Sequence, residues 1–470
     1  MNKYKKLFSD VGLFTISNFG SKIIVFLMVP LYTNILSSYE YGIVDLINST
    51  INLLFPVLTL AISEGILRFA FDKKYEQIQV LITAGYVVVI SIIIVCFSKP
   101  LVISLLGDLE KYWLYFILIY IGIASNNCLS NYIRGINKTK VFAIKGILYT
   151  VTFVALNIFF LIFLKMGING YLSSAVLSEV VTICYILKSI KIQIKRIDWK
   201  FNRQLFSDML RYSLPLIPSI IAWWIMQISD KYMIIFYLGI SASGIYSIAY
   251  KIPTILSMLT NIFMQAWQIS AIQNVDTKDN DIFVSQIYRY FTVFSIGGCS
   301  FLILFSKVLG EILYANEYFV AWTYVPILLM AYLFSGLSGV LASVFSAKKK
   351  TSVLFHSTLV GALVNIVFNF LLIPRFGAIA AAYTTLAGFC ITWMIRLISV
   401  KKIIKLETNG YKDLVSFLLV LTEAVVMSFD LNIKYVISVS IILVGIIIYS
   451  KELILLFNQV RHIQTRNRKR

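Results

Sequence analysis

Long apolar stretches alternate with short polar connections along the whole chain. Each stretch is continuous, as in residues 80–97, and lacks the two-residue alternation of a half-buried β-strand. A hydrocarbon layer roughly 30 Å thick is crossed by about 20 apolar residues in a helix, whereas membrane barrels need alternating strands of about ten residues. The pattern therefore predicts α-helical spans, about fourteen of them, at residues 11–34, 42–67, 79–98, 112–133, 143–164, 168–187, 210–237, 244–270, 287–306, 320–345, 352–373, 377–399, 413–429 and 433–450.

Composition supports an all-α integral membrane protein. Hydrophobic residues make up 59% of the 470 positions and charged residues only 14%. Soluble domains are about half apolar and about a quarter charged. Because the connections are also short, no sizeable soluble domain is expected on either side of the membrane. The first apolar stretch follows three lysines and is longer than the apolar region of a signal peptide, so it is interpreted as a retained helix.

The formal net charge of +20 is distributed in a way that orients the chain. Basic residues gather in alternate connections, at Lys73 and Lys74, Lys138 and Lys140, residues 188–203, 348–350 and 401–412, and in the tail 461–470. The other connections hold only Lys99, Lys111, Lys165, Lys307, Arg375 and Lys434. Since cytoplasmic loops carry the excess of Lys and Arg, both termini are predicted to be cytoplasmic. No soluble domain concentrates the charge, so nucleic acid is not an expected partner.

Cysteine and histidine give no sign of metal or covalent chemistry. The five cysteines, Cys96, Cys128, Cys184, Cys299 and Cys390, lie inside apolar stretches without metal-ligand spacing. We interpret them as small packing residues. His356 and His462 have no partner pattern either. No bound metal and no cofactor are predicted.

Internal similarity divides the chain. The segment "ILSSYEYGIVDLI" at 35–47 aligns without gaps with "YLGISASGIYSIA" at 237–249, and residues 138–174 align with 348–384 at a shift that places Gly167 on Gly377. Two halves with equal topology are parallel repeats of the kind found in rocking transporters. The predicted organisation is given by four ranges: a six-helix bundle at 1–190, a basic cytoplasmic linker at 191–209, a second six-helix bundle at 210–400, and two appended helices with a basic tail at 401–470.

Several segments carry a family resemblance. They are "SNFGSKIIVFLMVPLYTNILSSYEYGIVDLINS", "SEGILRFA", "SLPLIPS", "ISDKYMIIFYLGISASGIYSIAYKIP" and "LIPRFGAIAAAYTT", in this order and spacing. Over about residues 8–400 the chain resembles the polysaccharide-biosynthesis and O-antigen flippases of the multidrug/oligosaccharidyl-lipid/polysaccharide exporter superfamily. The resemblance implies two six-helix bundles around a central cavity that opens to alternate sides.

The resemblance also implies a cargo and a location. The cargo is an undecaprenyl-diphosphate-linked oligosaccharide repeat unit, moved across the bacterial cytoplasmic (inner) membrane for a cell-surface polysaccharide such as O-antigen, capsule or a teichoic acid-like polymer. Membrane lipids, a polysaccharide polymerase and glycosyltransferases are the partners it suggests.

Basic residues inside the predicted spans are candidates for binding the cargo's diphosphate. Charges in lipid are costly and mark functional sites by default, and Lys or Arg binds phosphate through charge-assisted hydrogen bonds. Spans one, two, seven and eight line the cavity in the family that the chain resembles, which selects Lys22, Arg68, Lys231 and Lys251. The alternative for each is a long side chain that snorkels to the interface.

Acidic residues inside the spans are candidates for ion coupling. Asp45, Glu64, Glu179 and Asp230 either carry a proton or sodium ion from a gradient or pair with a lysine as structural contacts. Asp230 and Lys231 point about 100° apart on a helix, so they need not pair with each other. Prolines break the helical hydrogen-bond ladder, and Pro215, Pro218 and Pro253 are candidate hinges or static kinks.

Three other functions are open. A cation-coupled multidrug exporter of the same superfamily is expected to favour acids and aromatics over lysines in its cavity. A peptidoglycan lipid-precursor flippase is a second relative. A membrane polysaccharide polymerase is less well supported, because the outward connections are short, and we predict that the chain is not an enzyme. No nucleotide-binding loop is visible, so an ion gradient or downhill cargo flow would supply the energy.

Overall fold

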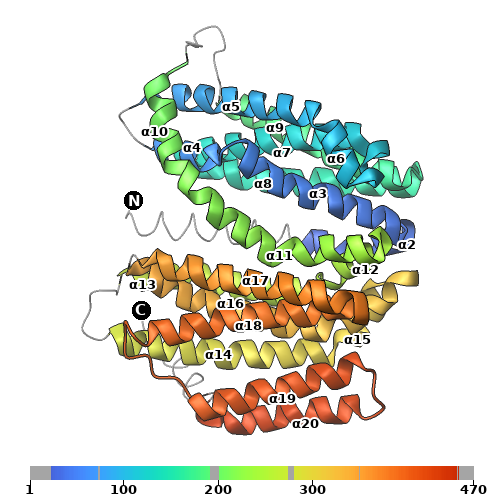
Figure 1. The fold of residues 1–470 in the computed structure, drawn as a ribbon, viewed down its shortest axis with the longest axis vertical. Coiled ribbons are helices and arrows are strands. Elements are labelled where there is room, and N and C mark those ends of the chain that lie inside the picture. Colours follow the sequence, from blue (N-terminus) through green and yellow to red (C-terminus); the bar gives the residue numbers. More distant parts are fainter. Residues whose placement is uncertain are drawn as a thin grey trace, which may run out of the picture. The chain divides into compact units, whose positions relative to one another are not determined.

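The computed structural model describes residues 23–71, 75–190, 201–273, 280–348, 350–452 and 454. These residues form helices and no strands, which confirms the predicted all-α fold (Figure 1). Ten helical segments in the described ranges are long and apolar enough to cross a membrane, and shorter apolar helices accompany them. The helices are α2 (Val29–Ile35), α3 (Ser38–Leu58), α4 (Ile62–Ala70), α5 (Gln77–Phe97), α6 (Lys99–Leu105), α7 (Trp113–Gly135), α8 (Thr139–Asn157), α9 (Gly167–Ile190), α10 (Arg203–Ser213), α11 (Ile217–Leu238), α12 (Ile240–Ala249), α13 (Pro253–Gln273), α14 (Asn280–Leu304), α15 (Ser306–Leu313), α16 (Val325–Ala347), α17 (Thr351–Phe376), α18 (Ala378–Val400), α19 (Gly410–Ser428) and α20 (Lys434–Ile448).

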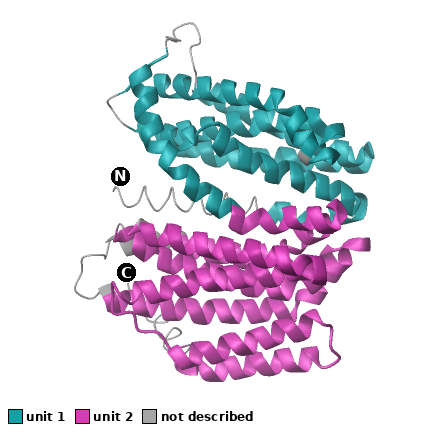
Figure 2. Cartoon of the chain, viewed as in Figure 1, with its two compact units in different colours: residues 1–224 teal, residues 225–470 magenta. Residues whose placement is uncertain are grey.

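The chain forms two compact units, residues 1–224 and 225–470 (Figure 2). The first contains α2 to α10 and the first turns of α11, and the second contains the rest of α11 and the helices up to α20. In the first unit α7 packs on α4, α5 and α9, and α8 packs on α9. In the second unit α16 packs on α13, α14, α18 and α19.

The second predicted span is two helices. α3 ends at Leu58 and α4 begins at Ile62, and Leu60 and Ala61 between them have positive φ angles of 54° and 50°. Pro56, near the end of α3, lacks a backbone N–H, and left-handed backbone conformations terminate helices. Asp45 and Glu64, predicted for one span, therefore lie on different helices.

The repeated segments begin new helices in both halves. Ser37 starts α3 with a capping box, because its hydroxyl accepts a hydrogen bond from the Glu40 N–H and the Glu40 carboxylate accepts one from the Ser37 N–H. At the aligned position Gly239 separates α11 from α12 with a φ of 87°. Gly167 and Gly377, which also align, both have positive φ; Gly167 is the first residue of α9 and Gly377 directly precedes α18.

A close helix crossing lies in the second unit. α17 and α18 meet where Gly361 faces Gly388, and a Cβ built at Gly361 would stand 2.7 Å from the Gly388 carbonyl oxygen. Near this crossing the buried Arg396 of α18 donates hydrogen bonds to Ser357 and Thr358 of α17 and to the Ser338 carbonyl of α16, at 2.9, 2.9 and 3.1 Å. Glycines allow close approach, and the guanidinium connects three helices.

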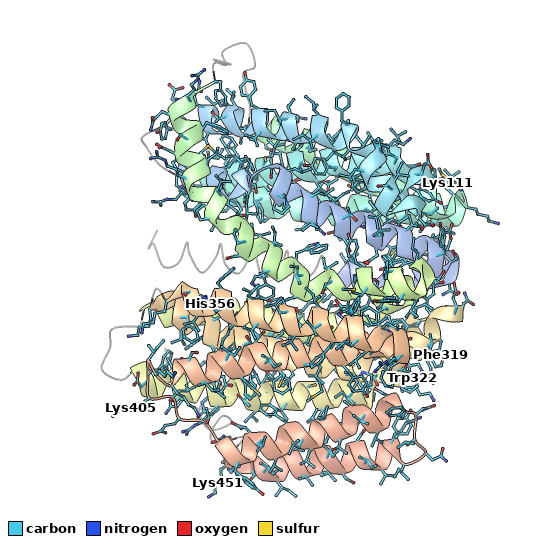
Figure 3. The ribbon with its side chains drawn as sticks, in the orientation of Figure 1. Lys111, Phe319, Trp322, His356, Lys405 and Lys451 are labelled. Atoms are coloured by element: carbon cyan, nitrogen blue, oxygen red, sulfur yellow. The ribbon has the colours of Figure 1, made fainter. Side chains whose placement is uncertain are left out.

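The appended pair α19–α20 packs side by side against α14, and α19 also packs on α16 (Figure 1). Polar contacts connect both ends of this pair to the rest of the unit. At one end, Arg289 of α14 donates to the Glu407 carboxylate at 2.8 Å, and the Lys405 N–H donates to Asp281 at 2.8 Å. Lys405 lies at this end and Trp322 at the opposite end (Figure 3).

At the opposite end, Lys307 of α15 lies 3.0 Å from the Asp430 carboxylate, to which Lys434 also donates a hydrogen bond. The hydrogen bond with Asp430 raises the pKa of Lys307. The hydrogen bond from Lys434, and then that from Lys307, lower the pKa of Asp430. α19 and α20 are therefore held to the second unit at both termini.

Candidate functional site

A fully buried carboxylate, Asp230 of α11, is the centre of a polar cluster in the second unit. Its Oδ2 atom accepts three hydrogen bonds, from the hydroxyls of Tyr246 of α12 and of Tyr250 directly after α12 at 3.0 and 2.8 Å, and from Thr385 of α18 at 2.8 Å. Its Oδ1 atom has no hydrogen-bond partner. One half of the carboxylate is thus fixed by hydroxyl groups, and the other half has unused capacity to bind a proton or a cation.

A second polar chain begins one residue away, at Ser229. The Ser229 hydroxyl donates to the Asn365 side-chain oxygen at 2.9 Å, and the Asn369 amide donates to the same oxygen at 3.1 Å. Thr384 donates in turn to Asn369. The Asn365 amide nitrogen has no partner. α11, α17 and α18 therefore bring hydroxyl and amide groups together in the interior of the unit, where unsatisfied polar groups are costly.

Two of the predicted cationic residues lie beside this cluster. The Lys231 ammonium is 5.6 Å from the centroid of the Tyr250 ring, a cation–π distance. Lys251 follows Tyr250 directly and lies in the short turn between α12 and α13, with a partly exposed side chain. The structure thus brings Asp230 and Lys231 together at Tyr250, and Lys251 is the next residue along the chain.

The candidate hinge prolines occur at helix boundaries. Pro215 lies in the 3₁₀ turn Leu214–Leu216 between α10 and α11, Pro218 lies in the first turn of α11, and Pro253 is the first residue of α13. Proline is tolerated at such positions because the first N–H groups of a helix have no intrahelical acceptor. Their role as hinges stays a prediction.

The remaining candidates belong to the first unit. Glu179 of α9 is buried and accepts a hydrogen bond from Asn126 of α7 at 2.5 Å. Asp45 of α3 is half-buried, and its carboxylate accepts a long hydrogen bond of 3.5 Å from the Ser49 hydroxyl. The structure does not place these two acids in one cluster.

Glu64 and Arg68 are both exposed, one turn apart on α4. Lys22 lies outside the described residues. Its predicted contact with a diphosphate, and that of Arg68, remain predictions.

Sequence reasoning missed the neutral members of the Asp230 cluster. Tyr246 of α12 and Tyr250, the residue that ends this helix, are four residues apart and therefore lie on the same side. Both lie in the segment "ISDKYMIIFYLGISASGIYSIAYKIP", and Thr384 and Thr385 end the segment "LIPRFGAIAAAYTT". The signal was the recurrence of hydroxyl groups within these segments, which the search for charged residues ignored.

Comparisons with known proteins agree with this fold. The model of the polysaccharide biosynthesis protein family matches residues 7–268, more than half of the chain. The chain belongs to this family. A curated relative, an uncharacterized membrane protein of Methanocaldococcus jannaschii, is 22% identical over 245 residues, and the chain spans about half of that relative, 47% of its length.

Two solved structures share the overall architecture. The lipid II flippase MurJ, in an inward closed conformation, is 16% identical with a TM-score of 0.70 over 94% of this chain and 99% of its own. An inward-facing MATE-family multidrug resistance transporter of the MOP superfamily is 16% identical with a TM-score of 0.67 over 83% and 94%. At these identities the likeness shows that the chain shares the fold of MurJ and the MATE transporter, and it leaves role and cargo open.

Proposed function

We propose that this family member translocates an undecaprenyl-diphosphate-linked oligosaccharide across the bacterial cytoplasmic membrane by alternating access. The observation that carries the proposal is the pair of lysines, Lys231 and Lys251, at the edge of the Asp230 cluster around Tyr250. A diphosphate that enters a cavity of low dielectric loses hydration, and ammonium groups offset that loss through charge-assisted hydrogen bonds. Family membership in polysaccharide biosynthesis supports a glycan-carrying lipid as the anion.

Asp230 is the proposed coupling residue. It is fully buried, and its free Oδ1 atom lies opposite the three hydroxyl donors on Oδ2. A proton or a sodium ion at Oδ1 would neutralise a charge that is otherwise costly in this interior. Since Tyr246 is on α12, Tyr250 directly follows that helix and Thr385 is on α18, occupancy of the carboxylate would change the contacts between α11 and both helices.

The test of cargo binding is translocation of undecaprenyl-diphosphate-linked oligosaccharide in reconstituted vesicles. We expect the double variant Lys231→Gln/Lys251→Gln to lose at least tenfold in rate, because two ammonium groups would no longer contact the diphosphate. Lys99→Gln, which changes a lysine of the first unit outside the cluster, is the matched control and is expected to flip cargo normally. Undiminished flipping by the double variant would remove the anion site from the proposal.

The test of coupling uses Asp230→Asn, which keeps the size of the side chain and removes its charge. We expect its transport to become insensitive to imposed proton and sodium gradients, whereas Asp108→Asn, a change at an exposed acid of the first unit, retains the wild-type response. A wild-type gradient response in Asp230→Asn would exclude Asp230 as the coupling residue.

The alternatives within the superfamily are separated by the same vesicles. A multidrug exporter would accumulate a cationic dye in response to a gradient and would gain activity when lysines are removed from its cavity. A peptidoglycan-precursor flippase would translocate lipid II in preference to the oligosaccharide. We expect neither result, because two lysines disfavour a cationic drug and the family is one of polysaccharide biosynthesis.

A further inference from the structure

A second buried acid lies in the appended helices, away from the Asp230 cluster. Glu423, in the middle part of α19, is fully buried, and its Oε2 atom accepts a hydrogen bond from the Ser300 hydroxyl of α14 at 2.5 Å. Its Oε1 atom has no partner. Among the described residues no ion pair includes Glu423. A carboxylate in this surrounding would be a buried charge without a counter-ion.

The helices that pack around Glu423 carry further polar and ionisable groups. Cys299 of α14 is fully buried next to Ser300, and the buried Ser438 hydroxyl of α20 lies near the Glu423 carboxyl, beyond hydrogen-bond distance of its Oε1 atom. The ionisable groups on the described parts of α14, α16, α19 and α20 are Asp281, Tyr288, Arg289, Tyr290, Cys299, Tyr332, Tyr411, Lys412, Asp413, Lys434 and Tyr435. Lys434, at the start of α20, bonds Asp430 rather than Glu423.

A small cavity lies next to Ser300, the residue whose hydroxyl donates to Glu423. It has a volume of about 160 Å³ and lies among α14, α19 and α20. Hydroxyl groups of Ser300, Ser416 and Tyr449 line it, together with Gly297 and Gly445. A Cβ built at either glycine would meet no atom within 4 Å, so the glycines face open space. A cavity of this size with several polar groups has room and partners for water.

The cavity is connected to the end of the helix pair where α19 begins. The Tyr449 hydroxyl donates to Asp413 of α19 at 2.8 Å. Asp413 also lines a larger cavity of about 610 Å³, together with Lys401, Thr408 and residues of α16 and α18. Hydrogen-bonding groups therefore follow one another from this larger cavity through Asp413 and Tyr449, across the small cavity, to Ser300 and Glu423.

We propose that Glu423 is a proton-binding site that exchanges its proton with the solvent through water in the small cavity and through Tyr449 and Asp413. A proton leaves Glu423 for the Ser300 hydroxyl, which gives its own proton to a cavity water, so the serine is unchanged after the transfer. Tyr449 accepts a proton from water as it gives its own to the Asp413 carboxylate, so the tyrosine is unchanged after each transfer. In the orientation predicted from the basic loops, this path opens to the cytoplasm.

The site is independent of the proposed flippase function, and its test does not measure transport. The full-length protein in lipid vesicles is examined by infrared spectroscopy for the carbonyl stretch of a protonated carboxylic acid, before and after transfer to D₂O. We expect a band at neutral pH that disappears in Glu423→Gln, a variant of nearly equal size, and that shifts rapidly in D₂O in the wild type. If the spectra of the wild type and Glu423→Gln show the same carboxylic acid bands, the proton-binding site is refuted.

The path is tested with Gly445→Leu, whose side chain would occupy the small cavity. We expect the Glu423 band to persist and its shift in D₂O to slow at least tenfold. Gly85→Leu is the matched control, because a Cβ at Gly85 of α5 also meets no atom within 4 Å but lies in the first unit. Equal exchange rates in Gly445→Leu and the wild type would refute the path through the cavity.

Discussion

The crossing of α17 and α18 yields a prediction that can be worked out from distances. In Gly361→Ala the new methyl group would lie 2.1 Å from the Thr392 hydroxyl oxygen and 2.7 Å from the Gly388 carbonyl oxygen. Contacts below 3.0 Å are essentially never made by real Cβ atoms. Thr392 is able to rotate, but the Gly388 oxygen belongs to the backbone, so the two helices have to separate by several tenths of an ångström.

The magnitude follows from two terms. Forcing an extra methyl group into a packed interior costs about 1–3 kcal/mol. Rotation of Thr392 would also give up its hydrogen bonds to the carbonyl oxygens of Gly388 and Ser357, which adds about 1 kcal/mol. We therefore expect Gly361→Ala to reduce the free energy of unfolding by roughly 2–4 kcal/mol.

The assay is thermal unfolding of the purified protein in detergent micelles, followed by vesicle translocation at a temperature where the variant is folded. Because Asn365 lies one turn from Gly361 on α17 and accepts the Ser229 hydrogen bond, the separation of the helices should also slow transport. Gly85→Ala is the control, since its Cβ meets nothing within 4 Å and Ala is the better helix former. A wild-type midpoint of unfolding for Gly361→Ala would refute this account of the crossing.

Three further predictions concern polar contacts. Tyr250→Phe removes one hydrogen-bond donor from the buried Asp230 carboxylate, and we expect a loss of about 1.5–3 kcal/mol in the free energy of unfolding. The control is Tyr237→Phe on α11, which is outside the cluster and should unfold like the wild type. Arg396→Lys cannot reproduce the bonds to Ser357, Thr358 and Ser338, so its unfolding midpoint should fall, and a midpoint equal to the wild type would show that one ammonium suffices. The Asp430–Lys307 contact should stabilise the fold at intermediate pH, where both groups are charged. This stability is lost as pH falls through the lowered pKa of Asp430, below the usual value of about 4. It is also lost as pH rises through the raised pKa of Lys307, above about 10.4. Because the Asp430 side chain is 43% exposed, the effect should stay below about 1 kcal/mol, and Asp430→Asn should abolish it in a pH series of unfolding measurements.

The hydrophobic pattern predicted the helices well because a lipid-spanning segment must satisfy all its backbone groups internally. Each predicted span falls on a helix or on two helices in sequence, apart from the beginning of the first, which lies outside the described residues. The break at Leu60 and Ala61 was not predicted, because left-handed backbone at non-glycine residues leaves no mark in a hydropathy pattern.

The candidate site was predicted in part. Intramembrane charge singled out Asp230, Lys231 and Lys251, and the fold brings the first two to Tyr250, which Lys251 follows in the chain. Thr385 donates a hydrogen bond to Asp230 across 155 positions of sequence. This contact could not be predicted, because the hydrophobic pattern does not show which residues of two helices meet. Glu423 lies within the predicted span 413–429, but the cavity beside Ser300 depends on glycines from two different helices, and a single sequence does not show that they face each other.

The connections at both ends of α19 and α20 have a mechanical consequence. Arg289 with Glu407 at one end, and Lys307 with Asp430 at the other, join the pair to α14 and α15 at two points far apart along the helix axes. These contacts act together with the packing of α19 on α14 and α16 and of α20 on α14, and they oppose movement of the pair relative to those helices. In a transport cycle α19 and α20 should move rigidly with the second unit, so a spin label on the lipid-facing side of α20 would report the displacement of that entire unit without disturbing the residues around Tyr250.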